Sequence, residues 1–129
     1  MRIWRIWLAV VGGVLVASGA LLAQEPDGDW PQWRGPSRDG VSAEKGLLDE
    51  WPADGPQLLW KGTGLGAGFS SVSVVKCRIY TMGDGDAASH VYCLSTKDGS
   101  KIWTSKPVGK TGGNYKGTRS TPTVIGNRV

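Results

Sequence analysis

The sequence contains very few of the residues that catalysis and metal binding use most often. Its 129 residues include one histidine, His90, and two cysteines, Cys77 and Cys93. Zinc-ligand spacing, a nucleophile elbow and a phosphate-binding loop are all absent from the sequence. A single histidine in a strand pattern is more often a surface or packing residue than a general base. The sequence favours a non-catalytic protein and leaves open whether it is an enzyme.

The sequence has no large excess of charge of one sign. It also has no long helical periodicity after residue 23. The net charge is +4, from 15 Lys and Arg against 11 Asp and Glu, and the sequence has no basic stripe. This balance gives no electrostatic support for nucleic-acid binding. Glycine and proline together account for 27 of the 129 residues, which is typical of a turn-rich β protein.

The segment 1–23 has the pattern of a secretory signal peptide. Arg2 and Arg5 precede an uncharged, mostly apolar run over residues 6–22, and Ala23 is followed by a polar, acidic stretch. The alternative is an uncleaved membrane anchor, for which the apolar run is short. The pattern predicts a periplasmic or secreted protein that contacts a membrane only through this segment, if the segment is retained.

Residues 24–54 form a predicted N-terminal arm without clear periodicity. The arm contains three tryptophans, Trp30, Trp33 and Trp51. Because each tryptophan can bury a large apolar area, we expect the arm to pack on the body of the fold. The alternative is an exposed aromatic surface that binds a sugar or polymer.

From residue 55 onwards the sequence predicts short strands separated by turns. Residues 57–60 form an apolar run, and alternating or β-branched residues predict strands over 71–75, 78–82, 90–95 and 101–104. Tight turns are expected at Lys76-Cys77 and over residues 97–100, the second because Asp98-Gly99 favours the positive φ that two-residue hairpins need. The four glycines at alternate positions over 62–68 indicate a loop and do not follow the dinucleotide-binding pattern. The four strands make one antiparallel meander.

The meander then begins to repeat itself. Residues 120–129 align with residues 70–79 at an offset of 50, and Trp60 matches Trp103 at a spacing of 43. A four-stranded unit that recurs roughly every 40 to 50 residues is the signature of a β-propeller blade. One meander cannot bury both of its faces, so it needs neighbouring units on either side.

The segment from Tyr92 to Trp103 resembles the pyrroloquinoline-quinone-type propeller repeat, whose motif positions Tyr92, Leu94, Gly99 and Trp103 occupy. The arm sequence around Trp30 resembles the exported bacterial branch of this family, which includes proteins similar to the outer-membrane assembly propeller. The resemblance implies an all-β propeller of four-stranded antiparallel blades. Residues 55–129 would supply the last strand of one blade, one full blade and the start of the next, as an N-terminal fragment. It also implies that Trp60 and Trp103 dock against neighbouring blades.

Two functions are compatible with this resemblance. The first is a non-catalytic binding or scaffold protein whose partners are other cell-envelope proteins, with no cofactor. The alternative is a fragment of a quinoprotein dehydrogenase, which would hold pyrroloquinoline quinone and a metal ion. Asp84-Gly85-Asp86 could bind a cation through oxygen atoms, although a solvated hairpin loop explains the same residues. The adjacent cysteine pair frequent in such enzymes is missing.

The spacing of the two cysteines argues against a disulfide. If Met82 pairs with Val91, Tyr80 faces Cys93 and Cys77 faces Thr96. The two cysteines are then three registers apart, or roughly 10 Å at the usual rise of a strand. That separation exceeds the reach of a disulfide, unless a bulge or register shift brings the cysteines together.

Overall fold

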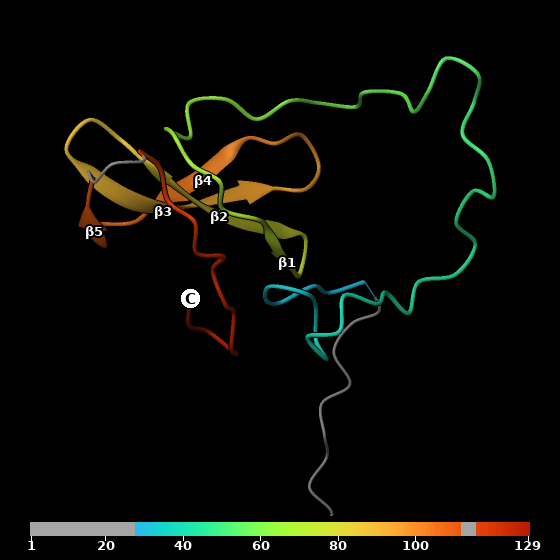
Figure 1. The fold of residues 1–129 in the computed structure, drawn as a ribbon, viewed down its shortest axis with the longest axis horizontal. Coiled ribbons are helices and arrows are strands. Elements are labelled where there is room, and N and C mark those ends of the chain that lie inside the picture. The colour runs from blue at the N-terminus through green and yellow to red at the C-terminus, as the bar shows by residue number, and fades with distance from the viewer. Residues whose placement is uncertain (1–27, 112–115) are drawn as a thin grey trace, which may run out of the picture.

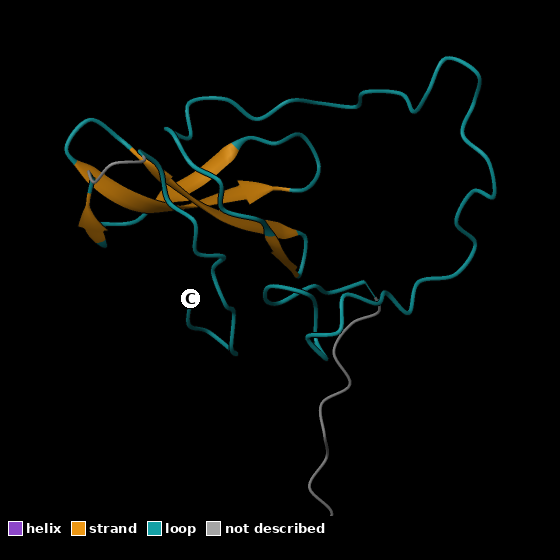
Figure 2. Ribbon diagram, viewed as in Figure 1, coloured by secondary structure: helices purple, strands orange, loops and turns teal. Residues whose placement is uncertain are grey.

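A computed structural model describes residues 28–111 and 116–129, and the predicted signal peptide at residues 1–23 lies outside this range. Within the described residues every regular element is a β-strand and no helix occurs (Figure 2). The strands are β1 (Ser73–Val75), β2 (Arg78–Asp84), β3 (Ala88–Ser95), β4 (Lys101–Thr104) and β5 (Gly109–Lys110). The all-β prediction is confirmed.

The strands form one antiparallel sheet in the order β1-β2-β3-β4, and the short β5 pairs with the beginning of β3 (Figure 1). Tyr80 lies opposite Cys93 and Met82 opposite Val91, which confirms the predicted register. The ladder continues further than expected, to the pair Asp84 and Ser89, and the predicted loop over 83–89 shrinks accordingly. The Ser89 hydroxyl donates to the Asp84 carboxylate at 2.6 Å, which holds the two strand ends together.

The two outer hairpins turn differently. Lys76 and Cys77 form a two-residue turn between β1 and β2, and both have positive φ, 49° and 60°. This is the conformation of a type I′ turn. The tight turn predicted over residues 97–100 begins one residue earlier, because the Ser95 amide bonds to the Ser100 carbonyl and encloses four residues, 96–99. Only Gly99 in that loop has positive φ, at 69°.

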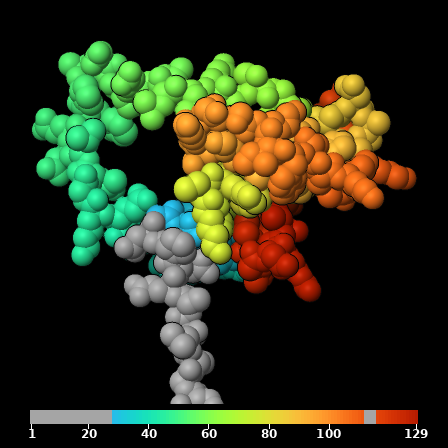
Figure 3. All heavy atoms as spheres, turned by 180° about the vertical axis from the view of Figure 1, so that it is seen from behind, coloured from blue at the N-terminus to red at the C-terminus, as the bar shows by residue number. Residues whose placement is uncertain are grey.

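The segments that flank the sheet in sequence cover part of each face, whereas all four residues of β4 are exposed. On one face Val75, Tyr80 and Cys93 form the hydrophobic core with Val124 of the C-terminal segment. On the other face Leu94 packs near Gly62, from the loop that precedes the meander. Figure 3 shows the C-terminal segment seated against the sheet. The meander is therefore a middle layer between the chain before it and the chain after it.

The C-terminal segment repeats the pairing of the β1–β2 hairpin, with positive φ only at Gly126 in its turn. Ile125 and Arg128 exchange two backbone hydrogen bonds of 3.0 Å around Gly126-Asn127, as Val75 and Arg78 pair around Lys76-Cys77. The two hairpins are therefore 50 residues apart, which is the repeat offset that the sequence indicated. Gly68 also forms a parallel bridge with Thr118, and these two residues are separated by the same offset.

Residues 43–65 differ from expectation. They form an arc that stands away from the sheet in both overall views (Figures 1 and 3), and residues 57–60 are not a strand. Trp51 is 70% exposed and Trp33 61% exposed, so the expected burial of these two tryptophans is wrong. The side chains of residues 43–59 are exposed, except at Gly55, whereas Trp60 near the end of the arc returns to the sheet. Trp30, by contrast, is half-buried.

Candidate functional site

Trp60 docks on the loop between β3 and β4. Its indole N–H donates to the Thr96 carbonyl oxygen at 3.0 Å. Its six-membered ring lies on Gly99, where an added Cβ would come within 2.5 Å of Trp60 Cε3. Glycine at this position serves both the positive φ and the close approach of the ring. The Trp60 side chain thus joins two segments of the chain that are far apart in the sequence.

Trp103 lies in β4 and has a different environment. It is 36% exposed, and its ring stands 6.0 Å from that of Tyr80 at an interplanar angle of 55°. Together with the C-terminal hairpin these two rings line a hollow of about 450 Å³ on the Val124 face of the sheet. Trp60 and Trp103, which the sequence pairs as equivalents, thus contact different partners within the described residues.

Tyr92 and Leu94, the other two motif positions, are buried in β3 and flank Cys93 in sequence. The ammonium group of Lys101 lies 5.3 Å from the centre of the Tyr92 ring, within the range of a cation–π contact. The same ammonium group donates to the Gly64 carbonyl at 3.3 Å. These residues therefore tie the glycine-rich loop to the sheet and offer no reactive group to solvent.

Two of the four alternate glycines over 62–68, Gly66 and Gly68, have a packing role. A Cβ on Gly66 would lie 2.2 Å from the Asp84 carbonyl oxygen, and one on Gly68 would lie 2.7 Å from the Thr118 side chain. Ala67 and Asp84 exchange backbone hydrogen bonds of 3.0 and 2.7 Å across this junction. Glycine is required at Gly66 because backbone lies on backbone there, whereas the sequence alone predicted only a loop.

The acidic loop is not assembled as a cation site. One carboxylate oxygen of Asp84 accepts the Ser89 hydroxyl at 2.6 Å, and the other accepts the Gly117 amide at 3.0 Å. Asp86 is exposed, at the tip of the turn. Among residues 28–111 and 116–129, no group of three His, Cys, Asp or Glu side chains is placed to hold a metal ion. Asp84 serves instead to join β2, β3 and the segment that begins at Gly117.

His90 lies in β3 and is half-buried. Its Nδ1 is 3.0 Å from the Ser105 carbonyl oxygen, so this nitrogen carries the proton and donates. The ring stands 6.3 Å from that of Tyr92. This arrangement fixes the imidazole against the chain that leaves β4, and no nucleophile of the described residues is hydrogen-bonded to it.

Both cysteines are free thiols. Cys77 is exposed at the first turn, whereas Cys93 is 0% exposed at the centre of β3. Burial raises the pKa of the Cys93 thiol, although the nearby Arg78 charge and a hydrogen bond with Tyr80 partly oppose the shift. The Cys77 carbonyl accepts hydrogen bonds from both the amide and the hydroxyl of Thr96 at 3.2 Å, which confirms that Cys77 faces Thr96.

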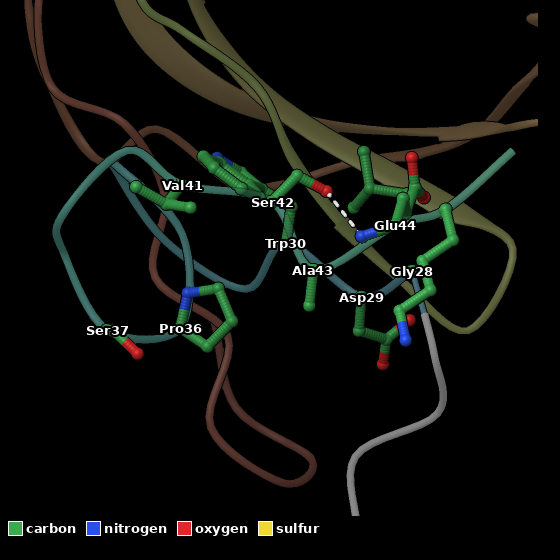
Figure 4. Close-up of a pocket in the computed structure, with 11 residues that line it drawn as sticks. Gly28, Asp29, Trp30, Pro36, Ser37, Val41, Ser42, Ala43 and Glu44 are labelled. Atoms are coloured by element: carbon green, nitrogen blue, oxygen red, sulfur yellow. Dashed lines mark hydrogen bonds between the residues drawn. The ribbon is translucent and has the colours of Figure 1, made fainter. Parts of the chain in front are cut away.

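The N-terminal arm forms a second hollow. Residues 28–45 fold into a compact cluster of turns beside β1, with an open groove of about 1210 Å³. Pro36, Ser37 and Val41 line one side of the groove, and Gly28, Asp29 and Glu44 line the other (Figure 4). One edge is stabilised by the Glu44 amide, which donates to the Ser42 hydroxyl at 3.2 Å.

The sequence predicted that this arm packs on the body of the fold, but the turns within the arm were not predicted. Gly35 lies directly under the Trp30 ring, since an added Cβ would be 2.8 Å from the ring. Arg34 and Arg38 both adopt positive φ, 65° and 59°, and the Arg38 guanidinium donates to Gln32 at 3.0 Å. The Pro, Gly, Arg and Asp residues clustered between Trp33 and Trp51 are a signal for successive turns. That signal could have predicted a compact cluster of turns.

No helix in the described part of the chain could cross a bilayer. The site as a whole consists of packing contacts between repeated segments and an open, mixed polar and apolar groove in the arm. A comparison of the chain with protein families, with curated proteins and with solved structures finds no match.

Proposed function

We propose that the meander is one blade of a β-propeller of the pyrroloquinoline-quinone-type repeat, and that the protein is an exported, non-catalytic binding or scaffold protein. Its partners would be other proteins of the cell envelope. The signal-like segment at residues 1–23 supports export, and the motif at Tyr92, Leu94, Gly99 and Trp103 supports the type of repeat.

The parallel contact between equivalent segments carries the propeller part of the proposal. Gly68 bridges Thr118 in parallel, and the Ser70 hydroxyl donates to the Ser120 carbonyl at 2.7 Å, each pair separated by the repeat offset. Successive units that repeat the same strand beside its predecessor, in the same direction, generate a ring or a stack. The sheet layered between flanking segments is what each unit of such an array requires.

The environment of the polar side chains supports the binding role. Asp84 and His90, the two candidates for chemistry in the sheet, already have backbone or hydroxyl partners. Large apolar side chains are instead exposed on β4 and on the arc, notably Ile102, Leu58 and Leu59. Exposed apolar side chains of this kind are typical of surfaces that contact another protein or another repeat.

Site-specific photocrosslinking tests the binding role. A photoreactive phenylalanine analogue would replace Ile102 in the full chain, expressed with its own leader in its source organism, and a matched probe would replace Lys110 on β5. We expect discrete adducts with envelope proteins from position 102 and fewer from position 110. Equal labelling from both positions, or no adduct from either, would contradict the proposal.

The dehydrogenase alternative has its own test. The purified protein would be titrated with pyrroloquinoline quinone and Ca²⁺, with tryptophan fluorescence and reduction of an artificial electron acceptor as readouts. A non-catalytic protein leaves both signals unchanged. Saturable quenching accompanied by acceptor reduction would replace the scaffold proposal with the dehydrogenase.

A further inference from the structure

Two consecutive carbonyl groups of the arm bond to the same position of two successive repeats. Trp30 and Val74 exchange backbone hydrogen bonds of 2.6 and 2.8 Å. The next carbonyl, that of Pro31, accepts the Val124 amide at 2.8 Å. Val74 and Val124 are separated by the repeat offset and therefore occupy equivalent positions. The Trp30–Pro31 unit thus joins two repeats through their backbones.

The arm adds backbone hydrogen bonds at this end, where the two repeats also contact each other directly through the Ser73 hydroxyl and the Pro122 carbonyl. Nearer the start of β1, the repeats touch each other, through Gly68 with Thr118 and Ser70 with Ser120. Farther along, the amides of Val74 and Val124 bond to the arm instead of to each other. Because buried backbone amides need partners, removing the arm would leave both groups unpaired at once.

Asp29 adds a third connection, to the strained turn after β1. Its Oδ1 accepts the Lys76 amide at 2.9 Å. Lys76 and Cys77 both have positive φ, which costs energy for residues other than glycine. A carboxylate that accepts the turn amide favours this conformation, so Asp29 fixes the turn that leads from β1 into β2.

The arm is internally braced before it meets the repeats. The Trp30 ring rests on Gly35, the Gly35 amide bonds to the Gln32 carbonyl at 3.0 Å, and the Gly40 amide bonds to the Arg34 carbonyl at 2.9 Å. A segment that is already ordered loses less conformational entropy when it binds than a flexible one does. The cluster of turns therefore holds the Trp30–Pro31 unit in a fixed orientation.

We propose that residues 29–40 act as a strap that couples two successive repeats, so that the backbone amides of Val74 and Val124 stay hydrogen-bonded only while the arm is seated. Release of the arm would free the ends of both repeats together and leave the β2–β3 ladder intact. The strap follows from contacts within residues 29–124 and does not depend on the proposed binding role.

Amide hydrogen exchange followed by NMR on the full chain tests the strap. Trp30→Ala removes the side chain that rests on Gly35, and Trp33→Ala is the matched control, because Trp33 is 61% exposed and stacks only near Arg34. We expect the amides of Val74 and Val124 to exchange about tenfold faster, or more, in Trp30→Ala alone. The amides of Tyr92 and Cys93 in β3 should keep their rates.

A milder variant keeps the test decisive if Trp30→Ala unfolds the protein. Gly35→Ala retains the indole but places a methyl group where the ring now lies, with φ already at +80°. Joint acceleration at Val74 and Val124 in this variant supports the strap. Acceleration at Val74 alone, an equal effect from Trp33→Ala, or equal acceleration throughout β3 in Gly35→Ala would overturn it.

Discussion

The hydroxyl of Ser70 donates a 2.7 Å hydrogen bond to the carbonyl of Ser120, its own equivalent one repeat later. Elsewhere on the sheet, Trp60 meets Gly99 in a similar contact between one unit and the next. Contacts of this kind make each unit depend on its neighbour for stability. The following variants measure that dependence.

Replacing Gly99 by alanine should disrupt the Trp60 contact. The new methyl group would lie 2.5 Å from Trp60 Cε3, and the residue must also keep a φ of +69°. Gly64→Ala is a matched control, because Gly64 has the same φ of +69° and nothing within 4 Å of the added methyl. We expect Gly64→Ala to cost about 1 kcal/mol in the free energy of unfolding and Gly99→Ala at least about 1 kcal/mol more. Urea unfolding followed by tryptophan fluorescence measures both values, and equal costs would contradict the contact.

Trp60→Phe isolates the hydrogen bond of the same contact. Phenylalanine keeps an aromatic ring on Gly99 but cannot donate to the Thr96 carbonyl, which Trp60 Nε1 reaches at 3.0 Å. The expected loss is about 1 kcal/mol in the free energy of unfolding. Trp51→Phe, at a 70% exposed position, should change stability by less than about 0.5 kcal/mol in the same urea titration. A smaller loss at position 60 than at position 51 would refute the role of the indole N–H.

Cys77→Gly should stabilise the protein. Cys77 has a φ of 60° in a two-residue turn, where glycine carries no steric penalty. We expect a gain of about 0.5–1 kcal/mol in the free energy of unfolding. Cys77→Ser keeps the strained backbone and should leave stability nearly unchanged, which separates the backbone effect from loss of the thiol. Thermal unfolding of the two variants makes the comparison, and a stabilisation by serine equal to that by glycine would argue against strain.

Alkaline pH should weaken the fold through Cys93. Its pKa is raised in the folded state by burial, so the unfolded chain releases the thiol proton at a lower pH than the folded protein does. The folded state then binds more protons, and stability is full at neutral pH and falls as the pH rises above the ordinary thiol pKa of about 8.5. Urea unfolding at pH 7 and pH 10 should show a steeper fall for the native protein than for Cys93→Ala. Parallel slopes for the two proteins would mean that Cys93 does not contribute.

Thiol labelling provides an independent check on the same residue. Ellman's reagent should react at once with the exposed Cys77 and reach Cys93 only after the sheet opens, because the buried thiol is 0% exposed. In Cys77→Ser the native protein should therefore show no fast-reacting thiol. A full fast equivalent in that variant would place Cys93 at the surface.

The strands could be predicted because their signals are local. The β-branched alternation around Val74, the turn at Lys76-Cys77 and the pairing of Met82 with Val91 all follow from residues close together in sequence. The four-residue loop at 96–99 could not be predicted from Asp98-Gly99 alone. The Asp98 carboxylate accepts both the amide and the hydroxyl of Ser100, at 3.0 and 2.7 Å, and closes a wider turn than the dipeptide indicates.

The arm and the glycine-rich loop required information that is not local. The partners of Trp30 and Pro31 are Val74 and Val124, and nothing in the arm sequence indicates either of them. Gly66 is defined by a contact with Asp84 that no pattern within 62–68 reveals. Composition alone led to the wrong expectation for Trp51, because a large apolar side chain is buried only if the fold supplies a surface for it.

The bond between the Pro31 carbonyl and the Val124 amide also sets an order of events during synthesis. At a translation rate of about 5–20 residues per second, Val124 leaves the ribosome roughly 5 to 20 seconds after Pro31. During that interval Trp30 can already bond to Val74 of the first repeat, whereas the Pro31 carbonyl has no Val124 amide to accept. The arm therefore gains its contacts in two stages, and the second stage waits until residue 124 has emerged.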